Sequence, residues 1–357
     1  RSTLFPYTTL FRSELEQYDP YTLLKDEKMT YDGNYTPQNY DYQYEGEVTL
    51  YDALKESKNA PAVWLLNEIG ISYSKEFLTK LGISLPNDHN LSIAFGGLYE
   101  VVTPIALVQA VRAFLHDGKS VAPYTVLKIK NKDGEVVAEA ETAETKVFSS
   151  QNAWNMTNML EAVVQSGTAT TGEYKKALAG KTGSTEHPHQ EGMFKDTWFV
   201  GYTPEYVGAV WIGYDQSDEN HYLTTGSSAP TKLMKDFLTQ FDLSENLQEE
   251  FVKPNGLKEF EQPVYLPVIT DLKGDKTFGL FKGVTAELQW SISEDDRVIY
   301  QVYEKTDDDD RLLGELEGKG FFVDREVKML EERTYYVVPV NPITNQKGQR
   351  SNEVTVK

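Results

Sequence analysis

The sequence predicts an α/β (α+β) domain, an antiparallel sheet flanked by helices, followed by a small all-β domain. Three observations predict this order. Apolar residues recur with helical spacing through the first half of the chain, and the spacing then changes to alternation near residue 177. A charged stretch with proline breakers, residues 244–262, precedes a second alternating region. A length of 357 residues also favours two domains.

Start and stop signals place four helices before residue 170. Thr49 and Asp52 have the spacing of a capping box, and Asn59 can cap the next helix, which Gly70 closes. Thr103-Pro104 begins a helix that Gly118 ends, and Ser149 or Ser150 begins one that Gly167 ends. We expect these helices to lie on one side of the sheet.

Three consecutive strands are predicted next, over Ala177–Ser184, Thr197–Tyr202 and Tyr206–Tyr214. A tight turn at Thr203-Pro204-Glu205 joins the last two, and a helix over 231–241 closes the domain. Beyond the predicted linker, residues 263–357 alternate in the manner of a fibronectin type III-like β-sandwich. The residues expected on its inner face are Val284, Ala286, Leu288, Trp290, Ile292, Tyr300, Val302, Tyr336, Val338 and Val340.

The first 13 residues, RSTLFPYTTLFRS, match the in-frame translation of a sequencing-library adapter. We therefore leave residues 1–13 out of fold reasoning and expect the natural sequence to begin near Glu14, with the first domain incomplete at its N-terminus.

Composition narrows the range of functions. A net charge of −20 argues against nucleic acid as a partner, because phosphate binding needs a basic face. The absence of cysteine excludes disulfides, cysteine nucleophiles and thiolate metal sites. No apolar run approaches the roughly 18 residues of a membrane-spanning helix.

The run Lys181-Thr182-Gly183-Ser184-Thr185 lies on the first predicted strand of the sheet. Lys181 would bring positive charge to a reacting centre, and the hydroxyls of Thr182 and Ser184 can hold a carboxylate. Gly183 would let a substrate backbone lie against the strand, and the Ser184 amide can donate to an oxyanion. An ordinary strand end is the alternative interpretation of this short motif taken alone.

The run Ser57-Lys58-Asn59 falls between two predicted helices, 124 positions before Lys181. Ser57 could relay a proton to a leaving group, and Asn59 could grip a substrate backbone. Lys58 is expected to point away. Taken alone, the motif is better explained as a helix end followed by a cap.

Together with their surroundings, these motifs resemble the transpeptidase domain of penicillin-binding proteins of the class A, bifunctional kind. The resemblance covers roughly residues 20–240 in family order. The matching stretches are Asn39-Tyr40-Asp41 with Gly46, Val48-Thr49-Leu50, Ala53-Leu54, Ser57 to Val63, Gly167-Thr168-Ala169, Gly180 to Thr185, and Asp196 to Pro204.

The resemblance implies a partial transpeptidase domain over 14–243, with Ser57, Asn59 and Lys181 as catalytic residues and Thr182, Gly183, Ser184 and Thr185 as substrate-binding residues. It implies a serine-type D,D-transpeptidase acting on the D-Ala-D-Ala stem peptides of peptidoglycan. It further implies binding of β-lactam antibiotics, no cofactor or metal, and an extracytoplasmic place in the bacterial cell envelope. A membrane anchor and a glycosyltransferase domain belong to the class A relatives upstream of this region.

The nucleophilic Ser-x-x-Lys motif of this family should lie roughly 55 to 65 residues before Ser57. No such motif precedes Ser57 in this chain, so we expect these residues to be inactive alone. Ser72 and Lys75 have the spacing but follow Ser57, and we interpret Ser72 or Ser74 as a helix cap. The alternative functions are a non-catalytic peptidoglycan-binding module and a D,D-carboxypeptidase-like hydrolase of the same superfamily.

Three other candidate sites have weaker support in the sequence. A metal site at His187 and His189 and a calcium site at 307–310 are each less favoured than a polar loop. The tyrosine-rich stretch from Tyr31 to Tyr51 could stack on glycans, but we favour a packed surface segment.

Overall fold

The computed structural model describes residues 19–31, 34–84, 90–96, 102–140, 142–279, 283–307 and 309–357, so the adapter-like segment 1–13 lies outside the described part. The chain divides into two compact units, Arg1–Phe260 and Glu261–Lys357. The predicted α/β region falls in the first unit and the predicted sandwich in the second.

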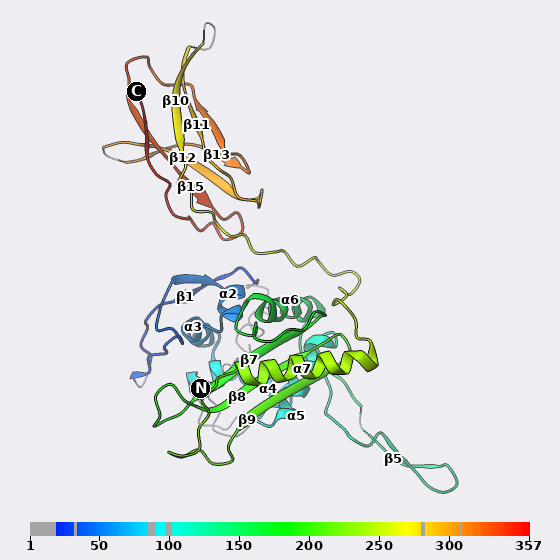
Figure 1. Ribbon diagram of the computed structural model, residues 1–357. Coiled ribbons are helices and arrows are strands. Elements are labelled where there is room, and N and C mark those ends of the chain that lie inside the picture. Colours follow the sequence, from blue (N-terminus) through cyan, green and yellow to red (C-terminus); the bar gives the residue numbers. More distant parts are fainter. Residues whose placement is uncertain are drawn as a thin grey trace. The chain divides into compact units, whose positions relative to one another are not determined.

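The sheet of the first unit has three antiparallel strands in the order β7-β8-β9 (Figure 1). They are β7 (Ala179–Glu186), β8 (Phe194–Tyr202) and β9 (Val207–Gly213). Because β7 is an edge strand, its outer backbone groups are not used by the sheet. The motif Lys181–Thr185 lies on this edge.

Helices cover both faces of the sheet, so the expectation of helices on one side was wrong. On one face, Tyr202 of β8 shares a 3.0 Å hydrogen bond with Thr157 of α6 (Ser150–Ser166). On the other, Gly208 of β9 lies under Met234 of α7 (Ser228–Glu245), where a Cβ atom would come within 2.8 Å of the methionine methyl. α5 (Pro104–Leu115) packs on β8, β9 and α6.

Two helices lead into and out of the Ser57 motif. The predicted cap of α2 (Leu50–Lys55) by Thr49 is confirmed, since Thr49 Oγ1 accepts from the Asp52 amide at 3.0 Å; the Asp52 side chain accepts from the Thr49 hydroxyl at 2.7 Å, which is not the backbone bond of a full capping box. The predicted cap of α3 (Asn59–Ile69) was wrong: Lys58 is the N-cap residue and Asn59 is already helical. Gly70 ends α3 at φ 88° and begins α4 (Ile71–Lys80) directly.

Several short elements gave no clear sequence signal. β1 (Leu23–Asp26) pairs with β2 (Gly46–Thr49), and β3 (Lys119–Ser120) pairs with β6 (Thr145–Lys146). A short 3₁₀ helix, η2, covers Leu91–Phe95.

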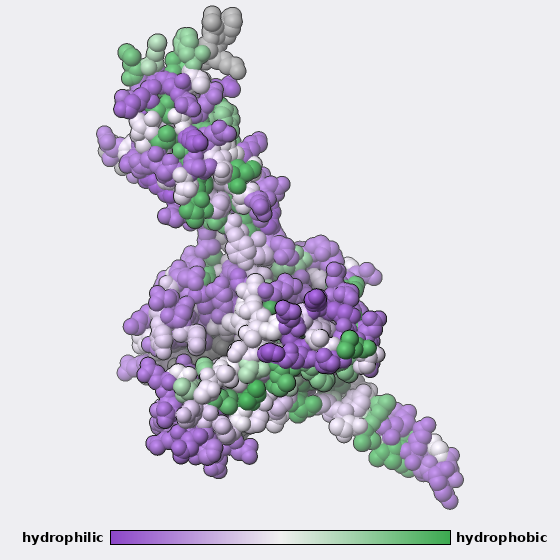
Figure 2. All heavy atoms as spheres, viewed as in Figure 1, coloured by the Kyte–Doolittle hydropathy of each residue, from purple (hydrophilic) through white to green (hydrophobic). Residues whose placement is uncertain are grey.

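A hairpin of β4 (Lys128–Lys130) and β5 (Val136–Glu139) projects from the first unit (Figure 1). Figure 2 shows hydrophobic residues gathered along it. The exposed apolar residues in this region are Tyr124, Val126, Leu127, Ile129, Val136 and Val137.

The segment after α7 folds back onto the first unit. Phe251 meets Tyr202 edge to face at 5.6 Å between ring centroids, and Phe260 lies 6.3 Å from Tyr21. Most of the predicted linker 244–262 is therefore part of the first unit, because its aromatic residues are anchored there.

The second unit holds a three-stranded and a four-stranded antiparallel sheet, in the orders β10-β11-β14 and β13-β12-β15-β16, and one cluster of buried residues draws on both sheets. The fibronectin type III-like β-sandwich stays a prediction. The strands are β10 (Lys273–Gly279), β11 (Gly283–Gln289), β12 (Ile299–Lys305), β13 (Arg311–Glu317), β14 (Phe321–Asp324), β15 (Arg333–Val340) and β16 (Val354–Val356).

Two parts of the predicted inner face were wrong. Ile292 lies beyond the end of β11 and is exposed. In β15 the side chains that join the core are Tyr335 and Val337, whereas the predicted Tyr336, Val338 and Val340 lie outside that cluster. Both faces of β15 are buried, so its apolar residues do not reveal which face meets the core.

Two glycines with left-handed backbones provide a test of this fold. Gly118 has φ 74°, and a Cβ atom there would lie 2.2 Å from the Phe148 carbonyl oxygen. Gly134 has φ 85°, with no atom within 4 Å of the same position. We expect Gly134→Ala to cost about 1 kcal/mol, the strain of a left-handed alanine. Gly118→Ala should cost about 2–3 kcal/mol more, because backbone cannot yield as a side chain can. Urea unfolding of both variants measures this, and equal costs would contradict the close approach.

Candidate functional site

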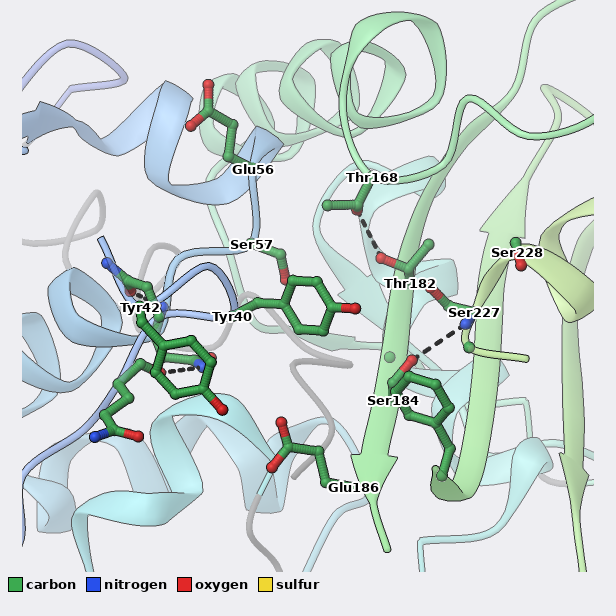
Figure 3. A pocket seen from close by; sticks show the side chains of 16 residues that line it. Tyr40, Tyr42, Glu56, Ser57, Thr168, Thr182, Ser184, Glu186, Ser227 and Ser228 are labelled. Carbon is green, nitrogen blue, oxygen red and sulfur yellow. Dashed lines mark hydrogen bonds between the residues drawn. The ribbon is translucent and has the colours of Figure 1, made fainter. Parts of the chain in front are cut away.

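A cavity of 450 Å³ lies between the Ser57 motif and strand β7 (Figure 3). Ser57 and Tyr40 lie on one side of it, and Thr182 and Ser184 lie on the other. Its lining residues are Gln38, Asn39, Tyr40, Tyr42, Glu56, Ser57, Asn59, Thr168, Thr182, Gly183, Ser184, Glu186, Phe194, Gly226, Ser227 and Ser228. The two motifs predicted from the sequence therefore face a common cavity.

The closest contact between the two motifs joins Lys181 and Ser57. The Lys181 ammonium donates to Ser57 Oγ at 2.5 Å and to the Thr182 carbonyl at 3.3 Å. Lys181 is only 4% exposed, and among the described residues no carboxylate forms an ion pair with it. Burial lowers the pKa of Lys181 to about 7, because desolvation disfavours its charged form. Near neutral pH this amine can thus both donate and accept a proton across the serine.

The hydroxyls of β7 are held by residues from other elements. Thr182 Oγ1 lies 2.6 Å from Thr168 Oγ1, and the Thr168 amide donates to the Lys55 carbonyl at the end of α2. Ser184 Oγ accepts from the Ser227 amide at 3.2 Å, which leaves its own proton for a ligand. The result is a pair of oriented hydroxyls on one wall of the cavity (Figure 3).

The remaining predicted residues fall in different places. Asn59 lines the cavity, and its side-chain amide donates to the Gln38 carbonyl at 2.8 Å. Gly183 also lines the cavity, whereas Thr185 does not. Lys58 points away from the cavity, as expected, into ion pairs with Glu45 at 2.6 Å and Asp26 at 3.3 Å.

Sequence reasoning missed the aromatic and acidic part of the cavity. Tyr40 is 77% exposed and Tyr42 is 65% exposed, and Glu186 lies opposite them (Figure 3). The interpretation of the tyrosine-rich stretch as a packed surface segment is wrong for these two residues. The available signal was the tyrosine enrichment just before Ser57. That enrichment does not show which tyrosine rings are buried: Tyr21 and Tyr51 are buried, whereas Tyr40 and Tyr42 are exposed.

The two histidines and the two serines of the weaker candidates do not line the cavity, and the calcium candidate at 307–310 includes residue 308, which lies outside the described residues. His187 Nε2 lies 3.1 Å from the Asp218 carbonyl oxygen, and the described residues include no cluster of three or more potential metal ligands. Ser72 and Ser74 are not caps, because α4 begins at Ile71 and Ser74 Oγ donates back to the Gly70 carbonyl. No helix within the described ranges is long and apolar enough to cross a membrane.

Comparison with known proteins identifies the family. The model of the penicillin-binding protein transpeptidase domain matches residues 2–239, which is well over half of the chain. The chain belongs to this family. The resemblance found in the sequence is therefore confirmed, and the cavity lies inside a transpeptidase domain.

Curated relatives support the same family. Penicillin-binding protein 1F of Bacillus subtilis is 46% identical over 345 residues, covering 96% of this chain and 47% of the relative. Penicillin-binding protein 2a of Streptococcus pneumoniae is 33% identical over 208 residues, covering 57% of this chain and 28% of the relative. The chain thus spans about half the length, or less, of the curated relatives it matches.

Solved structures share the transpeptidase fold. The penicillin-binding protein PonA1 from Mycobacterium tuberculosis superposes with a TM-score of 0.60 at 21% identity, covering 74% of this chain and 73% of that one. Penicillin-binding protein 1A from Haemophilus influenzae gives a TM-score of 0.56 at 18% identity, covering 76% and 45%. The predicted fold class of the first unit is confirmed.

The buried amine of Lys181 gives a prediction about stability. Unfolding returns its pKa from about 7 to the ordinary 10.5, so between these values the unfolded chain binds more protons than the folded one. The free energy of unfolding should therefore rise with pH by about 1.4 kcal/mol per unit relative to Lys181→Met. At or below pH 7 the methionine variant should be the more stable by about 2–4 kcal/mol, because it buries no charge.

Urea unfolding of both proteins at pH 7, 8 and 9 measures this difference. Lys195→Met is the matched control, because it makes the same replacement at an exposed position on the adjacent strand β8. If the difference in the free energy of unfolding between wild type and Lys181→Met does not change with pH, Lys181 keeps an ordinary pKa in the folded chain.

Proposed function

We propose that these residues form the non-nucleophilic side of a D,D-transpeptidase active site that crosslinks peptidoglycan stem peptides through a serine acyl-enzyme. The observation that carries the proposal is the buried Lys181 amine held against Ser57 at the edge of a hydroxyl-bearing strand. This arrangement provides a proton relay and a carboxylate-binding wall in one cavity.

Each predicted residue receives a role. Lys181 and Ser57 would pass a proton to the leaving group when the D-Ala-D-Ala bond breaks. Ser184 would donate its free hydroxyl proton to the terminal carboxylate of the peptide, with Thr182 beside it. Gly183 and the open edge of β7 would accept the peptide backbone as an added strand, and Asn59 would contact it from the opposite wall. Thr185 remains a proposed substrate-binding residue, although it does not line the cavity.

The nucleophile is assigned to a Ser-x-x-Lys upstream of Ser57, a motif that residues 14–56 do not contain. Loss of the catalytic serine from a comparable acyl-transfer enzyme costs about six orders of magnitude in rate. We therefore propose that residues 1–357 alone bind peptide and β-lactam without being acylated. The parent protein would act outside the cytoplasm, at the bacterial cell envelope.

A non-catalytic peptidoglycan-binding module is the second candidate, favoured by that missing motif together with the predicted β-sandwich of the second unit. A D,D-carboxypeptidase-like hydrolase is the third. β-lactam acyl-enzymes have been solved for penicillin-binding protein A from Mycobacterium tuberculosis, a structural neighbour of this chain. β-lactams are accordingly proposed as ligands of this cavity, and no cofactor is proposed.

Peptide binding by the Ser184→Ala variant tests the proposed role of the Ser184 hydroxyl in holding the carboxylate. The probe is an N-acylated peptide ending in D-Ala-D-Ala, titrated into the purified chain by NMR. A hydrogen bond to a charged carboxylate contributes about 1.5–3 kcal/mol, so the dissociation constant should rise at least about tenfold.

Ser166→Ala is the control, because Ser166 donates to its own helix at the Ala162 carbonyl. We expect it to bind the peptide as wild type does. A wild-type chain that does not bind the peptide, or an unchanged Ser184→Ala variant, would contradict the assignment.

A further inference from the structure

The backbone at Ser57 is held in a conformation that serine rarely adopts. Its φ is 59°, in the left-handed region, where a residue with a Cβ atom is strained. Such strain persists only where the surroundings fix it, and it is common at functional sites. The contacts that fix Ser57 are therefore part of the site.

Asn39 supplies the cap that α3 lacks. Its Oδ1 accepts from the Asn59 amide at 2.9 Å and from the Ala60 amide at 3.0 Å, the first two amides of the helix. The N-cap residue itself, Lys58, makes no side-chain cap bond. An amide group from 20 positions upstream thus fixes the chain two residues after Ser57.

The other end of the same side chain is equally fixed. Asn39 Nδ2 donates to Asp26 Oδ1 at 2.6 Å and to the Gln43 carbonyl at 2.7 Å. Asn39 is 3% exposed, and these four bonds use both of its donor hydrogens and both acceptor positions. A side chain so satisfied has one orientation.

Asp26 ties the residue next to Ser57 into the same network. It is fully buried, and its other oxygen lies 3.3 Å from the Lys58 ammonium. The backbone amide of Lys58 donates to the Ala53 carbonyl of α2 at 2.9 Å. Lys58 is therefore held at both its main chain and its side chain.

We propose that Asn39, held by Asp26, which in turn pairs with Lys58, is a positioning residue that places the Ser57 hydroxyl against Lys181. Asn39 touches neither the Lys181 amine nor the Ser57 hydroxyl in any hydrogen bond described above, so it acts through the backbone of the motif. Only the expected effect of Asn39 on ligand binding rests on the proposed function. The placement of Ser57 can be tested without a ligand.

The test compares Asn39→Ala with Thr103→Ala. Thr103 is the N-cap of α5, where its Oγ1 accepts from the Ala106 amide at 3.3 Å, and it does not line the cavity. Both variants remove a helix cap, but only Asn39→Ala frees the Ser57 backbone. The first measurement is the pH titration of the Lys181 side-chain amine by NMR, assigned with Lys181→Arg.

Ser57 lies between the Lys181 amine and the cavity, so its displacement should admit water and favour the charged amine. We expect Asn39→Ala to raise the Lys181 pKa by about one unit or more toward its ordinary value. Thr103→Ala should leave that pKa unchanged while lowering the melting temperature. An unchanged Lys181 titration in folded Asn39→Ala would overturn the proposal.

A second variant covers the case in which Asn39→Ala does not fold. Asp26→Leu combined with Lys58→Met replaces the buried ion pair by apolar side chains of similar volume, a change that proteins often tolerate. The double variant removes one hydrogen-bond acceptor from Asn39 and the ion pair that anchors the side chain at position 58. We therefore expect the same rise in the Lys181 pKa. If the Lys181 pKa of this double variant equals that of the wild type, the proposal is contradicted as well.

Peptide binding separates this inference from the proposed function. With the D-Ala-D-Ala peptide as probe, the dissociation constant of Asn39→Ala should rise about tenfold or more, as expected when a positioned hydroxyl is lost. If the wild type does not bind the peptide, the proposed function fails. The Lys181 titration still decides the role of Asn39 in that case.

Discussion

The site depends on one interaction, the hydrogen bond from a buried lysine amine to a serine hydroxyl. Lys181 is buried, no carboxylate in the described part of the chain forms an ion pair with it, and its amine donates to Ser57 Oγ and the Thr182 carbonyl. A buried charge without a counter-ion is costly, so the fold must hold both sides of this contact in place. The sheet holds Lys181, and the α2–α3 connection holds Ser57.

A second buried lysine shows how strongly the surroundings set this chemistry. Lys58 is adjacent to Ser57, and burial disfavours its charge as well, but hydrogen bonding to Glu45 and the charge of Asp26 outweigh that effect and raise its pKa. The pKa of Lys181 moves in the opposite direction, because burial disfavours its charge and none of the described acidic side chains forms an ion pair with it. One lysine can therefore act as a permanent anchor and the other as a proton carrier near neutral pH.

Much of the fold and about half of the site could be predicted from the sequence. The strands around Lys181 and the helices after Thr49 and Thr103 follow from local periodicity and capping signals. The cap that Asn39 gives to α3 could not be predicted, because it joins residues 20 positions apart through a side chain with no helical spacing. The exposure of Tyr40 and Tyr42 also escaped prediction, because an aromatic residue in a loop carries no periodic signal.

We infer that these residues complete an acyl-transfer site whose nucleophile lies upstream of Ser57. The most direct test is to map the serine acylated by a β-lactam, using peptide mass spectrometry. The mapping is carried out on residues 1–357 and on the whole protein that the gene encodes. We expect no adduct on residues 1–357 and a single adduct on a serine of a Ser-x-x-Lys upstream of Ser57. An adduct on Ser57 or Ser72 of this chain would contradict it.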